Sequence, residues 1–457
     1  ASATGNPGFN QGNDPEQMQD LAERIRRARA KRARKFQDSA EQAGAPPAAP
    51  SQTADASTAN GDTPAQKSKN KELKLKGIYY RQIYESVAEA KLMRAIESPR
   101  QLQEVMTDFW FNHFNIFANK GLDHLWIGAY EEQAIRPYAL GNFRDLLGAT
   151  CHHAGMLFYL DNWQNSAPGT RRGKKEIGLN ENYARELMEL HTLGVDGGYT
   201  QQDVIQLAHV LTGLGLPPQR GRRNAWGVPA PNDFGSYFDQ RRHDQGDKVI
   251  LGQTIHGSGP AEIEQALDIL AASPATAHHL SYQLAQYFVA DDPPKSLVDK
   301  LACTYSSSHG NIKAMLNTLF HSSEFWDPQY AEAKYKSPLR YVVSSLRAVD
   351  ARPENYRVLI QYLKQQGQPL YGCLTPDGYK NTREAWLNPG GLLHRIDFAT
   401  QLASGRMRGV TPQVTDPKQV ERSTGDVFSD KTMTAIARAP EKLRSALVLG
   451  SPEFMLY

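Results

Sequence analysis

From about residue 75 to the end of the chain, apolar residues recur at intervals of three and four positions, which places them on one face of a helix. An example is the run Val204, Leu207, Ala208 and Leu211. Thr200, followed by Asp203, resembles a helix-capping box just before that run. Strand-like alternation is scarce, and 248–252 is the best candidate. The pattern predicts a mainly α fold, in which one multi-helical domain over 75–457 carries long irregular loops such as 217–259.

Two segments of different character precede this domain. Residues 1–38 form a tail in which 17–37 predicts a helix, and the second half of that helix is dense in Arg and Lys. Acidic residues flank the basic run and offer ion pairs along the helix, which favours a solvated helix over an arm that binds nucleic acid or lipid. Residues 39–74 are rich in Ala, Pro, Ser and Thr, and this composition predicts a flexible linker.

Composition narrows the class of protein. The 457 residues are 40% apolar and 22% charged, which excludes a wholly disordered or collagen-like chain. No run approaches the roughly 18 apolar residues that a membrane-spanning helix needs. The net charge of +3 is too small to indicate a nucleic-acid partner. Three cysteines, Cys151, Cys303 and Cys373, leave at least one sulfur outside any disulfide, and such a thiol is a candidate for reaction or modification.

A first candidate site lies in the aromatic segment 108–114. Asp108 and Asn112 are four positions apart and share one face of the expected helix, while His113 points elsewhere. A His and a carboxylate among aromatic rings suit general acid–base catalysis or metal binding, because low polarity shifts their pKa values. The alternative is a core helix whose His and Asn cap neighbouring backbone groups.

A second candidate site is the charged helix 180–191. Arg185, Glu186 and Glu189 present acidic and basic groups together, and helical carboxylates at such spacing occur in carboxylate-bridged metal sites. The Glu-x-x-His element of those sites is missing, and the turn after this helix, with Asp196 and Asp203, lacks the ladder of a calcium loop. No metal site is therefore predicted here, and ordinary helical salt bridges are the alternative.

Two loops complete the candidate chemistry. His243, Asp244 and Lys248 form a polar turn that could bind an anion or substrate or supply a proton, although surface turns have the same composition. In the second loop, the neighbours of Cys373 are the electron-rich rings listed here: Tyr371, Tyr379 and Trp386. Oxidation can join such a thiol to a ring and give a protein-derived quinone or cross-linked redox cofactor. The alternative is an ordinary buried thiol.

Taken together, these segments resemble the bacterial proteins of domain-of-unknown-function family 1800, over residues 79–457. The resemblance implies a largely helical fold and an exported, periplasmic or secreted, bacterial setting, but no defined reaction. It also implies that the family's N-terminal helical portion is absent or replaced here, and that position 373 ordinarily carries a residue such as Pro. The matching stretches are Phe109-Trp-x-Asn-His-Phe114, Arg136-Pro-Tyr-Ala-Leu-Gly-x-Phe-Arg-Asp-Leu-Leu147, Tyr159-Leu-Asp-Asn162, Asn180-Glu-Asn-Tyr-Ala-Arg-Glu-Leu187, Thr192-Leu-Gly-Val195, Gly198-Tyr-Thr200, His243-Asp-x-Gly-x-Lys248, Lys336-Ser-Pro-Leu339, Pro376-Asp-Gly-Tyr379 and Trp386-Leu387.

Three functions follow as hypotheses. The first is an exported oxidoreductase with a redox centre made from Cys373 and one nearby ring, with His113 and Glu186 as proton-transfer groups and Arg185 as an anion partner. The second is a hydrolase or lyase of an envelope polysaccharide, with Asp108 and Glu186 as acid and base in an open groove lined by tryptophans. Those tryptophans are Trp110, Trp126 and Trp163. The third is a non-catalytic assembly module that docks a partner through residues 1–75.

Overall fold

The computed structural model describes residues 64–172, 175–217, 234–425 and 428–457, and all of them belong to one compact unit, Asp55–Tyr457. The basic helix predicted over 17–37 lies outside the described residues. The first long helix, α2 (Pro64–Glu97), begins inside the segment predicted as a linker, so 64–74 is helical rather than irregular. The rest of that predicted linker, 39–63, is not described.

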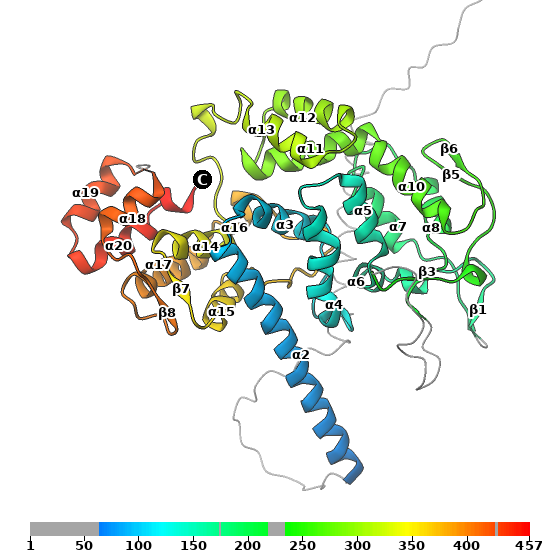
Figure 1. The fold of residues 1–457 in the computed structure, drawn as a ribbon, viewed down its shortest axis with the longest axis horizontal. Helices are drawn as coiled ribbons and strands as arrows, with labels where there is room; N and C mark the ends of the chain where they lie inside the picture. The colour runs from blue at the N-terminus through cyan, green and yellow to red at the C-terminus, as the bar shows by residue number, and fades with distance from the viewer. Residues whose placement is uncertain (1–63, 173–174, 218–233, 426–427) are drawn as a thin grey trace, which may run out of the picture. The chain divides into compact units, whose positions relative to one another are not determined.

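The described chain is mainly helical, as the apolar spacing predicts (Figure 1). After α2, the first part of the domain consists of short helices that pack on one another, with α4 against α2 and α6 and with α5 against α6. A π-helical turn, Glu131–Ile135, extends α4 and also contacts α3 and α5. These helices are α3 (Gln101–His113), α4 (Asp123–Tyr130), α5 (Phe143–His152), α6 (Ala154–Tyr159), α7 (Asn182–Glu189) and α8 (Gln201–Val210).

The second part of the domain contains two helical groups. In the first group, α11 packs on α10 and α12, and α12 packs on α13; in the second, α20 contacts α17, α18 and α19 (Figure 1). The helices are α10 (Ala261–Ala272), α11 (Pro274–Phe288), α12 (Lys295–Ser307), α13 (Ile312–Phe320), α14 (Pro338–Ala348), α15 (Arg357–Gln365), α16 (Arg383–Trp386), α17 (Pro389–Ala403), α18 (Pro417–Thr424), α19 (Asp430–Arg438) and α20 (Glu441–Leu449).

Strands are confined to antiparallel pairs within the described residues. The longest pair joins β5 (Lys248–Ile250) to β6 (Gln253–Ile255), at the position where the alternation predicts a strand. The other pairs are β1 (Arg171–Arg172) with β2 (Lys175–Glu176), β3 (Leu214–Gly215) with β4 (Tyr237–Phe238), and β7 (Arg352–Pro353) with β8 (Val410–Thr411).

Local sequence signals explain several helix ends. Thr200 and Asp203 form the predicted capping box at the start of α8, because each side chain binds the backbone N–H of the other residue. After α13, Ser322 donates its hydroxyl to the carbonyl of Leu319, three residues before it, and accepts the N–H of Phe325. After α20, Ser451 makes the same two contacts with its neighbours. The two similar sequences around these serines therefore fold into the same helix-ending turn.

Among the described helices, none combines the length and the apolar composition that crossing a bilayer would take.

Candidate functional site

The end of α3 fixes the loop that carries Cys373. The Asn112 side-chain amide donates to the carbonyl of Tyr379 at 2.9 Å and accepts the N–H of Tyr379 at 2.7 Å. Asn115 donates to the carbonyls of Cys373 and Thr375, at 3.1 Å and 2.9 Å. Gly378 passes Asn112 so closely, with φ of +67°, that a Cβ atom would collide with it. Asn112 thus binds neighbouring backbone, as the core-helix alternative expects.

Tyr159, at the end of α6, connects this loop to the charged helix. The Tyr159 hydroxyl donates to the carbonyl of Leu374 at 2.9 Å, and the side chain is fully buried. Burial raises the pKa of Tyr159 well above its usual range, and the nearby Cys373, Asp123 and Glu186 raise it further. Tyr159 is therefore hydrogen-bonded to the loop of Cys373, and the charge of Glu186 in the charged helix also acts on it.

Next to Tyr159 lies a trio of charged residues that the sequence analysis did not single out. Lys120 pairs with Asp161 at 3.1 Å between Nζ and Oδ2, and it also donates to the carbonyl of Tyr159. Asp123 is 0% exposed, and neither of its carboxyl oxygens has a hydrogen-bond partner. Burial raises the pKa of Asp123 well above its usual range; the charge of Lys120 opposes this and the charge of Asp161 adds to it. We call Lys120, Asp123 and Asp161 the carboxyl site.

The backbone around Asp161 is unusual, and the charged helix holds it in place. Asp161 has φ of 61°, a left-handed conformation that non-glycine residues seldom adopt and that is often found at functional sites. Asn180 donates to the carbonyl of Asp161 at 3.2 Å, and Asn182 donates to the carbonyl of Leu160 at 3.0 Å. With its side chain 36% exposed, Asp161 is a carboxylate at the surface, while Asp123 is an acid in the interior.

His113 lies in the core, on the side of α3 that faces α11. Its Nδ1 contacts the Gln283 side chain at 2.8 Å and its Nε2 contacts the carbonyl of His191 at 3.1 Å. Burial lowers the pKa of His113 to about 3, with the neighbouring His279 adding to the effect, so the ring is neutral at physiological pH. Trp110 packs edge-on against it and is 1% exposed. The prediction that Trp110 lines an open groove is therefore wrong.

Asp108 belongs to a different ionic cluster, together with one ring that the redox hypothesis uses. Asp108 Oδ1 and Glu131 Oε2 each lie 3.0 Å from the buried Nζ of Lys91. The Tyr371 hydroxyl donates to Glu131 at 2.9 Å. The charge of Lys91 lowers the pKa of Glu131 against the effect of burial, so the cluster stays ionised in the interior. The structure thus places Asp108 and Tyr371 in this ion cluster around Lys91.

Arg185 forms a helical salt bridge with Glu181 at 2.9 Å, as the alternative interpretation expects, and it donates a hydrogen bond to the Gln201 side-chain oxygen at 2.8 Å. Glu186, the next residue, is 5% exposed and faces the region of Tyr159. Arg185 and Glu186 therefore contact different parts of the structure.

Cys373 is a free, buried thiol whose Sγ lies 3.8 Å from both the carbonyl and the hydroxyl oxygen of Thr375. Burial raises the pKa of this thiol. Burial also raises the pKa of Tyr379, with Cys373 contributing, and the Tyr379 hydroxyl donates to the carbonyl of Pro369 at 2.8 Å. Trp386 packs against Tyr379 at 5.9 Å between ring centroids and donates its N–H to the carbonyl of Lys380.

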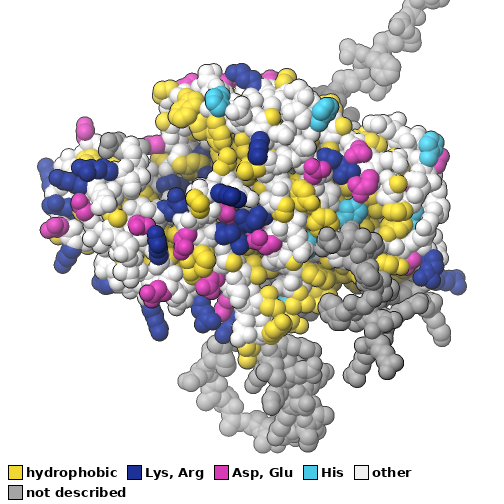
Figure 2. All heavy atoms as spheres, viewed as in Figure 1, with side chains coloured by type: hydrophobic (Ala, Val, Ile, Leu, Met, Phe, Trp, Pro, Cys, Tyr) yellow, Lys and Arg dark blue, Asp and Glu magenta, His cyan; other side chains and the backbone are white. Residues whose placement is uncertain are grey.

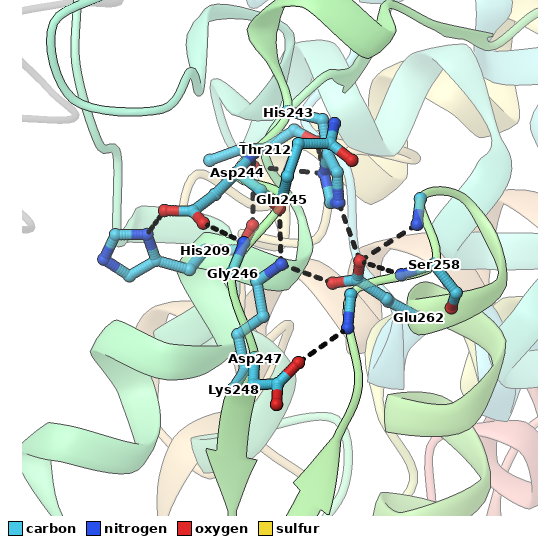
Figure 3. Close-up of polar contacts among 12 residues, drawn as sticks. His209, Thr212, His243, Asp244, Gln245, Gly246, Asp247, Lys248, Ser258 and Glu262 are labelled. Atoms are coloured by element: carbon cyan, nitrogen blue, oxygen red, sulfur yellow. Dashed lines mark hydrogen bonds and ion pairs between the residues drawn. The ribbon is translucent and has the colours of Figure 1, made fainter.

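The turn predicted to bind an anion is shown in Figure 3. Glu262 Oε2 lies 2.5 Å from Lys248 Nζ, Glu262 Oε1 lies 3.1 Å from His243 Nε2, and all three side chains are buried. The carboxylate of Glu262 therefore pairs with His243 and Lys248, the residues that the sequence analysis expected to bind an anion. Asp244 binds His209 Nδ1 at 2.8 Å at the edge of this cluster, and the other ring nitrogen of His209 points away from it.

Across the part of the chain that the structure describes, no group of three or more His, Cys, Asp or Glu side chains is arranged to hold a metal ion. Asp203, considered above for calcium, caps α8 and also accepts the backbone N–H of Leu251 at 2.8 Å.

Comparison with known proteins gives one match, to the sequence model of a family described as a protein of unknown function, DUF1800, over residues 10–456. The chain belongs to the DUF1800 family. The match begins at residue 10 and is therefore longer than the resemblance over 79–457. No curated protein and no solved structure matched the chain.

Within this DUF1800 protein, the residues quoted for the resemblance carry part of the carboxyl site. Asp161 stands in the Tyr159-to-Asn162 stretch, and Asn180 and Asn182, which hold its backbone, stand in the next one. Those stretches were the signal that could have identified Asp161. Lys120 and Asp123 lie in none of them, and only the folded structure shows that Asp123 is buried without a partner.

Proposed function

We propose that this DUF1800 protein is a hydrolase or lyase that acts on a polysaccharide through acid–base catalysis at the carboxyl site. The observation that carries the proposal is the difference between two neighbouring carboxyl groups. Asp123 is buried without a hydrogen-bond partner, and this burial raises its pKa, whereas Asp161 is paired with Lys120 at the surface. Two carboxyl groups with contrasting environments are the usual acid and base of glycosidic bond cleavage.

The roles follow from exposure and charge. Asp161 is exposed enough to meet a substrate and would act as base or nucleophile. Asp123 would supply the proton to the leaving oxygen, because burial raises its pKa and so favours the protonated form. Lys120 forms the ion pair with Asp161, and its charge opposes the rise in the pKa of Asp123. These roles replace the earlier assignment to Asp108 and Glu186.

Product formation tests the proposal. Neutral and acidic polysaccharides would be incubated with the full chain, and new reducing ends or unsaturated ends would be measured. Asp161→Asn and Asp123→Asn should each lose at least about a hundredfold in rate, the lower range of general acid–base contributions. Asp299→Asn is the matched control, because Asp299 forms an exposed ion pair with Lys295. Cleavage that survives in Asp161→Asn would refute the proposal.

A second proposal is the redox centre. It is favoured by the free, buried thiol of Cys373, which lies in the same loop as Tyr371 and Tyr379. Joining the thiol to a ring forms a C–S bond and passes two electrons and two protons to an external oxidant such as dioxygen. The protein then loses two hydrogens, so intact mass after reduction tests the proposal directly. A mass lower than the plain sequence by two hydrogens, lost in Cys373→Ser, would support the centre. The plain mass without visible absorbance would exclude it.

The setting and the third function are also proposals. The family resemblance supports an exported location, periplasmic or secreted. A docking role would involve residues 1–75, most of which lie outside the described residues. Removing 1–63, which precede the first described helix, should leave polysaccharide cleavage intact, whereas a docking module would lose its partner.

A further inference from the structure

A group of basic residues lies where α14 is joined to α17. Lys336 precedes α14, Arg340 stands in the first turn of this helix, and Arg395 stands on α17. Arg395 Nη2 donates to the carbonyl of Lys336 at 2.6 Å, and the Tyr341 hydroxyl of α14 donates to the carbonyl of Arg395 at 3.0 Å. We call Lys336, Arg340 and Arg395 the basic cluster.

Aromatic rings pack against all three cations. The Nζ of Lys336 lies 4.2 Å from the centroid of the Phe454 ring and donates to the carbonyl of Phe454 at 2.6 Å. The guanidinium of Arg340 lies over two tyrosine rings, at 4.1 Å and 4.2 Å from their centroids. That of Arg395 also lies over two tyrosine rings, at 4.4 Å and 4.9 Å. A ring face attracts a cation but carries no net charge, so these contacts do not neutralise the cluster.

Among the residues that the structure describes, no Asp or Glu forms an ion pair with the basic cluster. Asp291 pairs instead with the buried Lys334. The charge of Asp108 acts on Arg340, but Asp108 is already paired with Lys91 at 3.0 Å. The basic cluster therefore keeps an excess of positive charge.

The basic cluster also contains a hydrogen-bond donor without an acceptor. Arg395 is 1% exposed, and its Nη1 is buried without a hydrogen-bond partner. Burial lowers the pKa of Lys336 to about 8, and the charges of Arg340 and Arg395 add to this effect. Burying a cation without a counter-charge costs free energy, and so does burying a donor without an acceptor. A bound anion would supply both the charge and the acceptor.

Exposure and donor geometry narrow the class of anion. Lys336 and Arg340 are half-buried and so reach the surface, whereas Arg395 is buried, which favours a small group over a polymer. Figure 2 shows further Lys and Arg side chains gathered at the surface near α16, the short helix that precedes α17, and such charges attract anions. Three cations without a counter-charge favour a dianion. A phosphate group is small and carries up to two charges, and its oxygens match the paired donors of a guanidinium.

We propose that the basic cluster is a binding site for a phosphate group, carried either by inorganic phosphate or by a small phosphate monoester. The phosphate oxygens would accept hydrogen bonds from Arg395 Nη1, from the Lys336 ammonium and from the Arg340 guanidinium. The basic cluster belongs to α14 and α17, whereas the carboxyl site belongs to α4 and to the segments beside α4 and α6. Phosphate binding therefore does not rest on the proposed cleavage of a polysaccharide.

Calorimetric titration of the full chain tests the site, with inorganic phosphate and glycerol 3-phosphate as probes and acetate as a control anion, all at one ionic strength. At least one of the two phosphate probes should bind. Lys336→Met and Arg340→Met should each weaken that binding about tenfold or more, the scale of a hydrogen bond to a charged group. Lys313→Met is the matched control and should bind like the wild type, because Lys313 is an exposed lysine of α13, outside the cluster.

Thermal melting separates a ligand site from a purely structural cluster. The phosphate probe that binds should raise the melting temperature of the wild type and of Lys313→Met, but not that of Lys336→Met. Circular dichroism would confirm that the variants fold, and Lys336→Arg, which keeps the charge, should retain binding. Tighter binding of inorganic phosphate would identify the free ion as the ligand, and tighter binding of glycerol 3-phosphate would identify a monoester. Binding of neither phosphate probe, an equal response to acetate, or wild-type binding by Lys336→Met would overturn the proposal.

Discussion

Replacing Glu262 by Gln tests the account of the buried turn in Figure 3. The Glu262 carboxylate accepts hydrogen bonds from Lys248, from His243 and from the backbone N–H groups of Ser258 and Gly259. The Lys248 side chain is 2% exposed, so loss of the opposite charge leaves a buried ammonium without a counter-ion. Removing one member of a buried pair costs about 3–5 kcal/mol. Glu262→Gln should lower the free energy of unfolding by about that amount.

A double-mutant cycle separates the ion pair from simple loss of packing. Urea denaturation would give the free energy of unfolding for wild type, Glu262→Gln, Lys248→Met and the double variant. Because the double variant has no unpaired charge, it should be less destabilised than the sum of the single variants, by about 0.5–3 kcal/mol of coupling. A cost below about 1 kcal/mol for Glu262→Gln, or strict additivity, would refute the buried pair and return Lys248 to the role of an anion ligand.

Three further predictions concern other described contacts. Asp123→Asn should raise the melting temperature at about pH 8 but not at about pH 4. At the higher pH the unfolded chain releases a proton that the raised pKa of Asp123 retains in the folded wild type, and this costs about 1.4 kcal/mol of stability per unit of raised pKa. Calorimetry that finds no pH-dependent difference between the two proteins contradicts this prediction. Asn112→Leu should lower the free energy of unfolding by about 2–3 kcal/mol, because it leaves backbone groups of Tyr379 unpaired. Hydrogen exchange should accelerate in the loop that carries Tyr379, and unchanged exchange would contradict the role of Asn112 in holding this loop. Ser322→Ala and Ser451→Ala should each lower the free energy of unfolding, measured with denaturant, by about 1 kcal/mol. A clear difference between the two values would contradict the claim that the two serines play the same role.

The fold was predictable because its signals are local. Helical spacing, the Thr200–Asp203 capping box and the short alternation at 248–252 each depend on residues within a few positions of one another, and each appears in the structure. The start of α2 was missed, since 64–74 has a composition typical of linkers and yet continues a long helix. Composition describes only the average tendency of a segment. A helix that begins in the next segment of the chain can extend backwards into a segment whose composition is typical of a linker.

The candidate site was predictable only in part, because burial and partners are not local properties. The sequence indicated that the segments of Asn112, Glu186 and Cys373 carry candidate chemistry, and the structure joins the first of them to the loop of Cys373 through the side-chain amides of Asn112 and Asn115. The sequence did not indicate that Trp110 is buried while Trp126 is only partly buried. Nor could it distinguish Asp123, whose carboxyl group has no partner, from an ordinary aspartate at a helix start.

The pH dependence of polysaccharide cleavage tests the central claim most directly. The rate constant kcat/KM would be measured across pH on an oligosaccharide of the polysaccharide that the wild type cleaves, for wild type, Asp123→Glu and Asp161→Asn. The account predicts activity that falls as pH rises through the raised pKa of Asp123, a displaced fall in Asp123→Glu, and loss of cleavage in Asp161→Asn. Cleavage by Asp161→Asn at the wild-type rate, or an alkaline fall that Asp123→Glu leaves in place, would contradict it.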